Sequence, residues 1–156
     1  MILPLTLILF CLQSCAAEET VNIYGHQLVP CSSPGMAKTG WMRDGQCGSA
    51  RGDAGSHHVC IDLSSVTGGN FCTTTGQPNW CDDNMPCQGY EGLCPVEHWC
   101  VCQWAFASYV QAAGGCDKIQ EVVCESVNIN AKDAYESSSS PSHQAALACL
   151  KEKCGI

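Results

Sequence analysis

This chain of 156 residues has few basic side chains, no long apolar run and none of the common catalytic motifs. Seven Lys and Arg stand against fifteen Asp and Glu, which gives a net charge of −8. Because nucleic acids and anionic membranes attract basic surfaces, this balance argues against either as a partner. No apolar segment approaches the roughly 20 residues that a spanning helix needs, so we expect no stable membrane insertion. A nucleophile elbow, a phosphate-binding glycine loop and a His-Glu-x-x-His zinc helix are also absent, so no reaction class is indicated.

The amino-terminal residues have the pattern of a secretory signal. An apolar run over residues 1–12 is followed by Ser14-Cys15-Ala16-Ala17, whose small side chains suit cleavage after Ala17. We therefore predict a signal peptide over residues 1–17 and a secreted, extracellular protein. In an alternative interpretation, Leu12-Gln13-Ser14-Cys15 is a lipoprotein processing site, and the mature chain is lipid-anchored through Cys15.

Cysteine is what the chain has in abundance. Two of the fifteen cysteines lie in the predicted signal peptide, which leaves thirteen in residues 18–156. Such a density is typical of domains that disulfides stabilise in an oxidising compartment. Because thirteen is an odd number, one sulfur must stay free, pair between chains or bind something else. With no internal repeat or domain boundary, residues 18–156 are predicted to form a single disulfide-rich domain.

The stretch His98-Trp99-Cys100-Val101-Cys102 is the predicted centre of the fold. As a strand it places Cys100 and Cys102 on one face with His98, and Trp99 and Val101 on the other. Alternation over residues 57–63 predicts a second strand, with Val59, Ile61 and Leu63 facing one way and His58, Cys60 and Asp62 the other. A third strand is predicted over residues 119–127.

Two helices are predicted to cover this sheet. Residues 104–113 have helical composition and are followed by Gly114-Gly115 as a stop, and residues 141–154 follow Ser140 as N-cap and end at Gly155. Residues 32–55 are expected to form an ordered loop anchored by Trp41 and Met42, and cross-links are expected to hold residues 64–95. The predicted fold class is α+β: a small, mostly antiparallel sheet with two or three helices, disulfide staples and long ordered loops.

A family resemblance is carried by several short segments in order and spacing: Asn22-Ile23-Tyr24-Gly25, Leu28, Cys31-Ser32, Thr39-Gly40-Trp41, Arg43-Asp44-Gly45-Gln46-Cys47, Asp53-Ala54-Gly55-Ser56-His57-His58-Val59-Cys60, Gly69-Asn70, Gly92-Leu93 and Trp99-Cys100-Val101-Cys102. Together they resemble the domain of unknown function 2237, a family of small and mostly bacterial proteins, over Asn22 to about Glu136. The resemblance implies a compact α+β fold and no established activity. Where the family usually has Arg-Trp and a later histidine, this chain has Ala105-Phe106 and Asn128.

The resemblance also divides the cysteines. Five match family positions: Cys31, Cys47, Cys60, Cys100 and Cys102. The other eight are predicted to form four added disulfides: Cys72, Cys81, Cys87, Cys94, Cys116, Cys124, Cys149 and Cys154. Since five is odd, the unpaired sulfur is expected to belong to the family set.

Two candidate sites use this family set. A zinc or other transition-metal site would take Cys60, Cys100 and Cys102 with His57 or His98, because thiolate and imidazole are the ligands that such metals prefer. Ordinary disulfides are the competing interpretation, since the paired knuckles of structural zinc sites are missing. A thiol-redox role for Cys100-Val101-Cys102 is a further alternative, although the two-residue gap of thioredoxin-like sites is absent.

Polar loop residues supply the remaining candidates. Arg43, Asp44, Asp53 and His57 would line a ligand pocket with His57 as acid or base; alternatively, they fix the loop through hydrogen bonds to the backbone. Arg51-Gly52-Asp53 spells an integrin-recognition tripeptide, which arises easily by chance. Cys81-Asp82-Asp83-Asn84 offers oxygens to calcium, but no twelve-residue loop pattern follows.

These observations favour a secreted, non-enzymatic binding or structural module. The alternative is a metal-binding or thiol-active protein that uses Cys60, Cys100 and Cys102 with His57.

Overall fold

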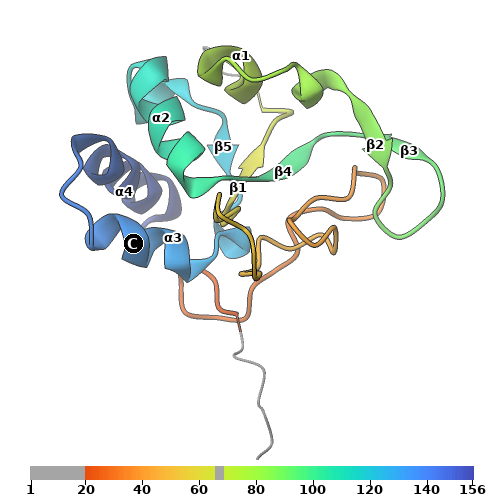
Figure 1. The fold of residues 1–156 in the computed structure, drawn as a ribbon, viewed down its shortest axis with the longest axis horizontal. Coiled ribbons are helices and arrows are strands. Elements are labelled where there is room, and N and C mark those ends of the chain that lie inside the picture. The colour runs from red at the N-terminus through yellow and green to blue at the C-terminus, as the bar shows by residue number, and fades with distance from the viewer. Residues whose placement is uncertain (1–19, 66–68) are drawn as a thin grey trace, which may run out of the picture.

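The computed structural model describes residues 20–65 and 69–156, and the predicted signal peptide and lipid-anchoring Cys15 lie outside these residues. Figure 1 shows a central sheet with helices to one side and a projecting hairpin at the other. The strands are β1 (Val59–Asp62), β2 (Asn84–Pro86), β3 (Leu93–Pro95), β4 (His98–Val101) and β5 (Glu121–Val122). The helices are α1 (Phe71–Thr75), α2 (Gln103–Ala113), α3 (Ile129–Glu136) and α4 (Pro141–Cys154). None of the described helices is long and apolar enough to cross a membrane.

The central sheet is antiparallel, with strand order β4-β1-β5. In its register Cys60 lies opposite Cys100 and Ile61 lies opposite Trp99. Because side chains alternate along a strand, the two cysteines share one face and the two apolar residues share the other. The predicted α+β fold, with its small antiparallel sheet and disulfide staples, is therefore confirmed.

One face of the sheet, here called the helix face, carries Val59, Ile61, Trp99 and Val101. These residues belong to the main apolar core, which α2, α3 and α4 complete. Within this layer α2 packs against α4 and α1, and α3 packs against α4. Burial of apolar surface at roughly 25 cal/mol per Å² stabilises this side of the molecule.

Local sequence signals set the ends of the two long helices. α4 occupies the predicted residues 141–154, with Pro141 in its first turn and Gly155 in a left-handed conformation at its end. α2 starts one residue before the prediction and ends at Gly114, whose φ of 87° strongly favours glycine. Both helices are thus confirmed.

Three parts of the fold were not predicted correctly. The short helices α1 and α3 lie in segments without clear periodicity, where Asn70 and Asn128 accept the backbone N–H groups of Thr73 and Asn130 as N-caps. The predicted strand 119–127 is wrong for most of its length, since only Glu121–Val122 pairs as a strand. The amides of Ser126 and Val127 donate instead to Val123 and Cys124, so the chain turns.

The opposite face of the sheet, here called the loop face, is covered by residues 20–56, which contain no helix. Two disulfides tie this segment to neighbouring strands, Cys31–Cys60 to β1 and Cys47–Cys100 to β4. Their four half-cystines form a small buried cluster of their own. Trp41 and Met42, predicted to anchor the loop, are 47% and 67% exposed, so they do not anchor it. The two disulfides and the buried side chains of Ile23 and Ala37 hold the segment instead.

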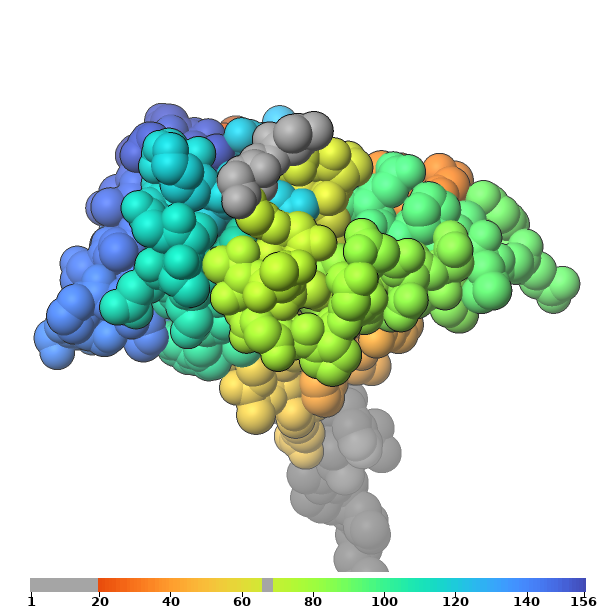
Figure 2. Space-filling view, turned by 90° about the horizontal axis from the view of Figure 1, so that it is seen from above, coloured from red at the N-terminus to blue at the C-terminus, as the bar shows by residue number. Residues whose placement is uncertain are grey.

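The region between β1 and β4 is also held by cross-links, as expected. Cys72–Cys81 joins α1 to the turn after it, and Cys87–Cys94 closes the β2–β3 hairpin. In Figure 2 the part of this segment around α1 lies between α2 and the projecting β2–β3 hairpin. Two more disulfides, Cys116–Cys149 and Cys124–Cys154, fasten α4.

Candidate functional site

A pocket of about 300 Å³ opens beside β4, the edge strand of the sheet. Aromatic and aliphatic side chains from α1, the following turn, β2 and β4 form its apolar wall: Phe71, Trp80, Met85 and Trp99. Its polar wall contains Arg43, His57 and Cys102. An apolar hollow with a few convergent polar groups is the usual form of a small-molecule site.

Arg43 brings a positive charge to this pocket. Its guanidinium lies 4.9 Å from the centre of the Trp99 ring, a cation–π contact, and it forms no ion pair within residues 20–65 and 69–156. The backbone of Arg43 has a φ of 55°, which is unfavourable for any residue other than glycine. An unpaired guanidinium in a strained turn beside an aromatic wall is suited to bind an anionic group.

Asp53 and His57 form a tightly coupled pair at the pocket wall. Oδ1 of Asp53 lies 2.6 Å from Nδ1 of His57, and Oδ2 accepts the His57 amide at 2.8 Å. Burial alone would raise the pKa of Asp53, but the hydrogen bonds from His57 outweigh burial, so this pKa lies below its ordinary value of 3.8. In the neutral tautomer that suits this contact, Nδ1–H of His57 donates to the carboxylate and Nε2 is the acceptor. Trp41 stacks on the same ring, with 5.5 Å between ring centres.

Cys102 is the one described cysteine outside a disulfide. It is half-buried and stands at the N-cap of α2, directly after β4. Burial raises the pKa of the Tyr135 phenol, and a charge on Cys102 would raise it further. The unpaired sulfur thus belongs to the family set, as the family resemblance implied.

A buried hydrogen-bond network fixes the loop of His57 against the start of α2. Nδ1 of His58 lies 2.9 Å from Oε1 of Gln103, and Nε2 lies 3.2 Å from Oγ of Ser49. The Gln103 amide also donates to the carbonyl of Ser56 at 3.0 Å. Burial lowers the pKa of His58 below 6.5, so the ring is neutral and donates from Nδ1 to Gln103.

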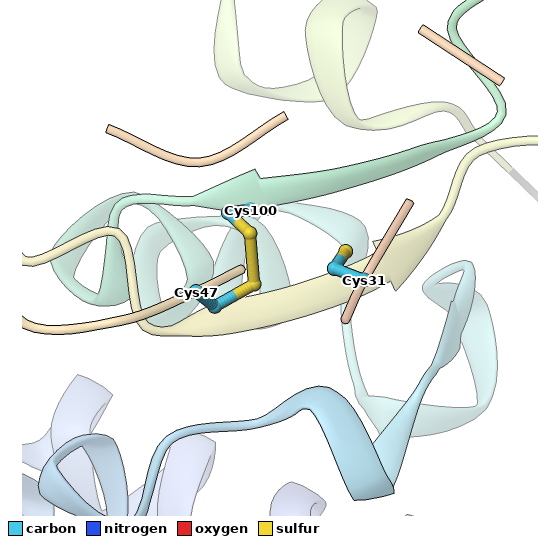
Figure 3. Close-up of side chains that lie close together, drawn as sticks. All are labelled: Cys31, Cys47 and Cys100. Carbon is cyan, nitrogen blue, oxygen red and sulfur yellow. A yellow bond between two sulfur atoms is a disulfide. The ribbon is translucent and has the colours of Figure 1, made fainter. Parts of the chain in front are cut away.

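The predicted three-sulfur metal site is not formed. Cys60 and Cys100 are bonded to Cys31 and Cys47, so of the predicted sulfurs only Cys102 is a thiol. The sulfurs of Cys31, Cys47 and Cys100 do lie within 4.8 Å of one another. Figure 3 shows these three side chains close together. Zinc takes thiolates, however, and a disulfide sulfur carries no such charge, so this donor set does not fit a metal in the oxidised protein.

Other predicted site residues have different roles. Asp44 accepts the backbone amide of Gln46 and fixes its turn, and His98 contacts the carbonyl of Cys31. The Asp53 side chain is only 2% exposed, so the Arg51-Gly52-Asp53 tripeptide does not present its carboxylate to a receptor.

The acidic turn and one departure from the family pattern also have structural explanations. In the acidic turn around Asp82 and Asp83, Asp82 accepts a hydrogen bond from Asn79. Asn128, where the family usually has histidine, caps α3 and donates to the carbonyl of Cys47.

The structure brings Arg43, Asp53 and His57 to one place, with Cys102 beside them. Sequence reasoning missed the apolar wall, because Phe71, Trp80 and Met85 lie in a segment with no periodicity and only its fold assembles them.

The fold and site define a disulfide-stapled α+β domain with a thiol in a ligand-sized pocket. Residues 21–139 match the model of a family described as "Uncharacterized protein conserved in bacteria (DUF2237)", and the chain belongs to this family. No curated protein matches the chain. The match ends before α4, and two disulfides join this helix to Cys116 and Cys124 within the matched residues.

Proposed function

We propose that this protein is a secreted, non-enzymatic binding module whose pocket beside β4 takes a small ligand with an anionic group and an apolar body. The pairing of an unpaired Arg43 with the aromatic wall around Trp99 carries this proposal. Six disulfides support an oxidising and extracellular setting, because such bonds persist there and are reduced in the cytosol.

The pocket's charge supports the choice of ligand. Arg43 is the only permanently charged residue in the lining, and the nearby Asp53 carboxylate is already bound by His57. The protein's net charge of −8 would repel an anion in general. Binding of an anion in this pocket therefore depends on its local attraction to Arg43. An aromatic anion would pack its ring against the apolar wall and place its charge beside Arg43.

Binding of 8-anilinonaphthalene-1-sulfonate, followed by its fluorescence, tests this function. Arg43→Gln should weaken the affinity by about tenfold, roughly 1.4 kcal/mol, because one charge-assisted contact is lost. Arg51→Gln is the matched control, since Arg51 is an exposed loop arginine outside the pocket. Equal affinities for the two variants would contradict the proposal.

A thiol-active protein is the second candidate, and the free Cys102 favours it. Since this thiol shares the pocket with His57, the ligand's contact with the protein can include a covalent bond.

A further inference from the structure

The side chains of Cys102 and His57 both lie close to Gly55. A Cβ atom at Gly55 would lie 2.8 Å from Cε1 of His57 and 3.4 Å from Cβ of Cys102. Those two atoms are therefore no further apart than the sum of these distances, with no side chain from residue 55 between them. The 3.0 Å bond from the Gln103 amide to Ser56 fixes their relative position.

This arrangement supplies a nucleophile, a base and an orienting carboxylate. Asp53 holds Nδ1 of His57, so Nε2 is the ring atom that can accept the thiol proton. Arg43 stands in the same pocket as an anion-binding group. The four groups come from two loops and the end of β4, and only Cys102 of the described cysteines has escaped oxidation.

The surroundings of Cys102 also favour one of two reactions of a thiol, disulfide exchange over acyl transfer. Acyl transfer needs backbone donors for an oxyanion, commonly the amide that follows the nucleophile. Here that amide, from Gln103, is already bonded to the Ser56 carbonyl. Displacement at a sulfur atom forms no oxyanion, so it needs no such donor.

We propose that Cys102 exchanges with small disulfides that carry an acidic group, with Arg43 binding the acid and His57 acting as base. His57 takes the Cys102 proton, and the thiolate attacks one sulfur of the ligand. A bond from Cys102 to that sulfur forms as the ligand's own S–S bond breaks, and the departing thiolate takes the proton from His57. One ligand half stays on the protein and the other leaves as a thiol, so capture is stoichiometric. This inference rests on the proposed function and names its ligand class.

Intact-mass kinetics with two probes test the inference: dithiodiglycolate, an acidic disulfide, and cystamine, a basic one of similar size. Wild type should gain one half of dithiodiglycolate about tenfold faster than one half of cystamine, because Arg43 attracts the acid. Arg43→Gln should lose this preference, and Arg51→Gln should keep it. Cys102→Ser should gain nothing.

The pH dependence of the capture rate distinguishes His57 as a base from His57 as a purely structural residue. Near pH 7, His57→Gln should slow capture by about 100-fold, the usual contribution of a general base. At about pH 9.5, where thiols ionise without help, the variant should approach the wild-type rate. Equal rates for both probes, or a His57→Gln rate that stays low at high pH, would overturn the inference.

Anilinonaphthalene sulfonate binding by Cys102→Ser separates this inference from the function on which it rests. If that variant still binds the probe through Arg43 while wild type captures no disulfide, the exchange is disproved, but the proposed binding of anionic ligands is supported. If the probe fails to bind as well, the proposed function falls with it.

Discussion

The two faces of the central sheet are stabilised by different means. The helix face is apolar and continuous, with Ile61 and Phe106 fully buried among three helices. The loop face has almost no apolar core, and two disulfides over the Cys60 and Cys100 pair hold a long loop there. Side chains in a packed core are fixed by their neighbours, whereas a loop tied at two points leaves polar residues free to line a site. The pocket lies where the two faces meet, at the edge of β4.

Removing a loop-face disulfide should have the largest effect on stability. Cys47 and Cys100 are 53 residues apart, so the chain-entropy model gives about 4 kcal/mol for their bond. Replacing both with alanine should lower the free energy of unfolding by this amount in chemical denaturation. The matched pair Cys87 and Cys94 is only 7 residues apart and should cost about 2 kcal/mol. Equal losses would mean that the loop face does not depend on its long-range link.

A core truncation tests the helix face. Ile61→Ala should cost roughly 3 kcal/mol, because it removes buried methyl groups and leaves a cavity. The disulfides and the pocket should remain, so capture of dithiodiglycolate should be unchanged under native conditions. A core variant that lost capture while still folded would show that the two faces are not independent.

Acid should weaken the loop face through His58. Its pKa in the folded protein lies below the ordinary 6.5, so folding favours the neutral ring. The stability that this ring contributes is complete above pH 6.5 and is lost as the pH falls through the folded-state pKa. His58→Asn should remove this part of the pH dependence in denaturation curves. An unchanged slope in the variant would assign the acid sensitivity to another group.

The smallest structural change should give a specific loss of reactivity. A methyl group in Gly55→Ala would lie 2.8 Å from Cε1 of His57 and push the ring away from Cys102. Capture near neutral pH should therefore slow, with little change in the free energy of unfolding. Gly48→Ala is the control, because a Cβ there meets nothing within 4 Å. The same capture rate in both glycine variants would mean that the position of His57 does not affect the reactivity of the Cys102 thiol.

Periodic and local signals explain which parts of the fold were predictable. Alternation fixed the two faces around Cys60 and Cys100, and caps such as Pro141 and Gly155 marked α4. The turn over Cys124–Ser126 was not predicted because Ile and Val residues flank it on both sides, as in a strand, while long-range contacts decide its shape.

The candidate site was only partly predictable for the same reason. Arg43, Asp53 and His57 could be singled out as polar residues in ordered loops, and the cysteine count indicated one free sulfur. Which sulfur stays free depends on distances between strands and loops, and no spacing in the sequence encodes those distances.

Mass spectrometry of a non-reduced digest, after alkylation of free thiols in the intact protein, tests whether two disulfides hold the loop face while Cys102 remains a thiol. The structure predicts peptides linked through Cys31–Cys60 and Cys47–Cys100, with the alkyl group on Cys102 alone. A peptide that links Cys102 to Cys60 or Cys100 would contradict the account, because the loop face would then be tied differently and the pocket would contain no thiol.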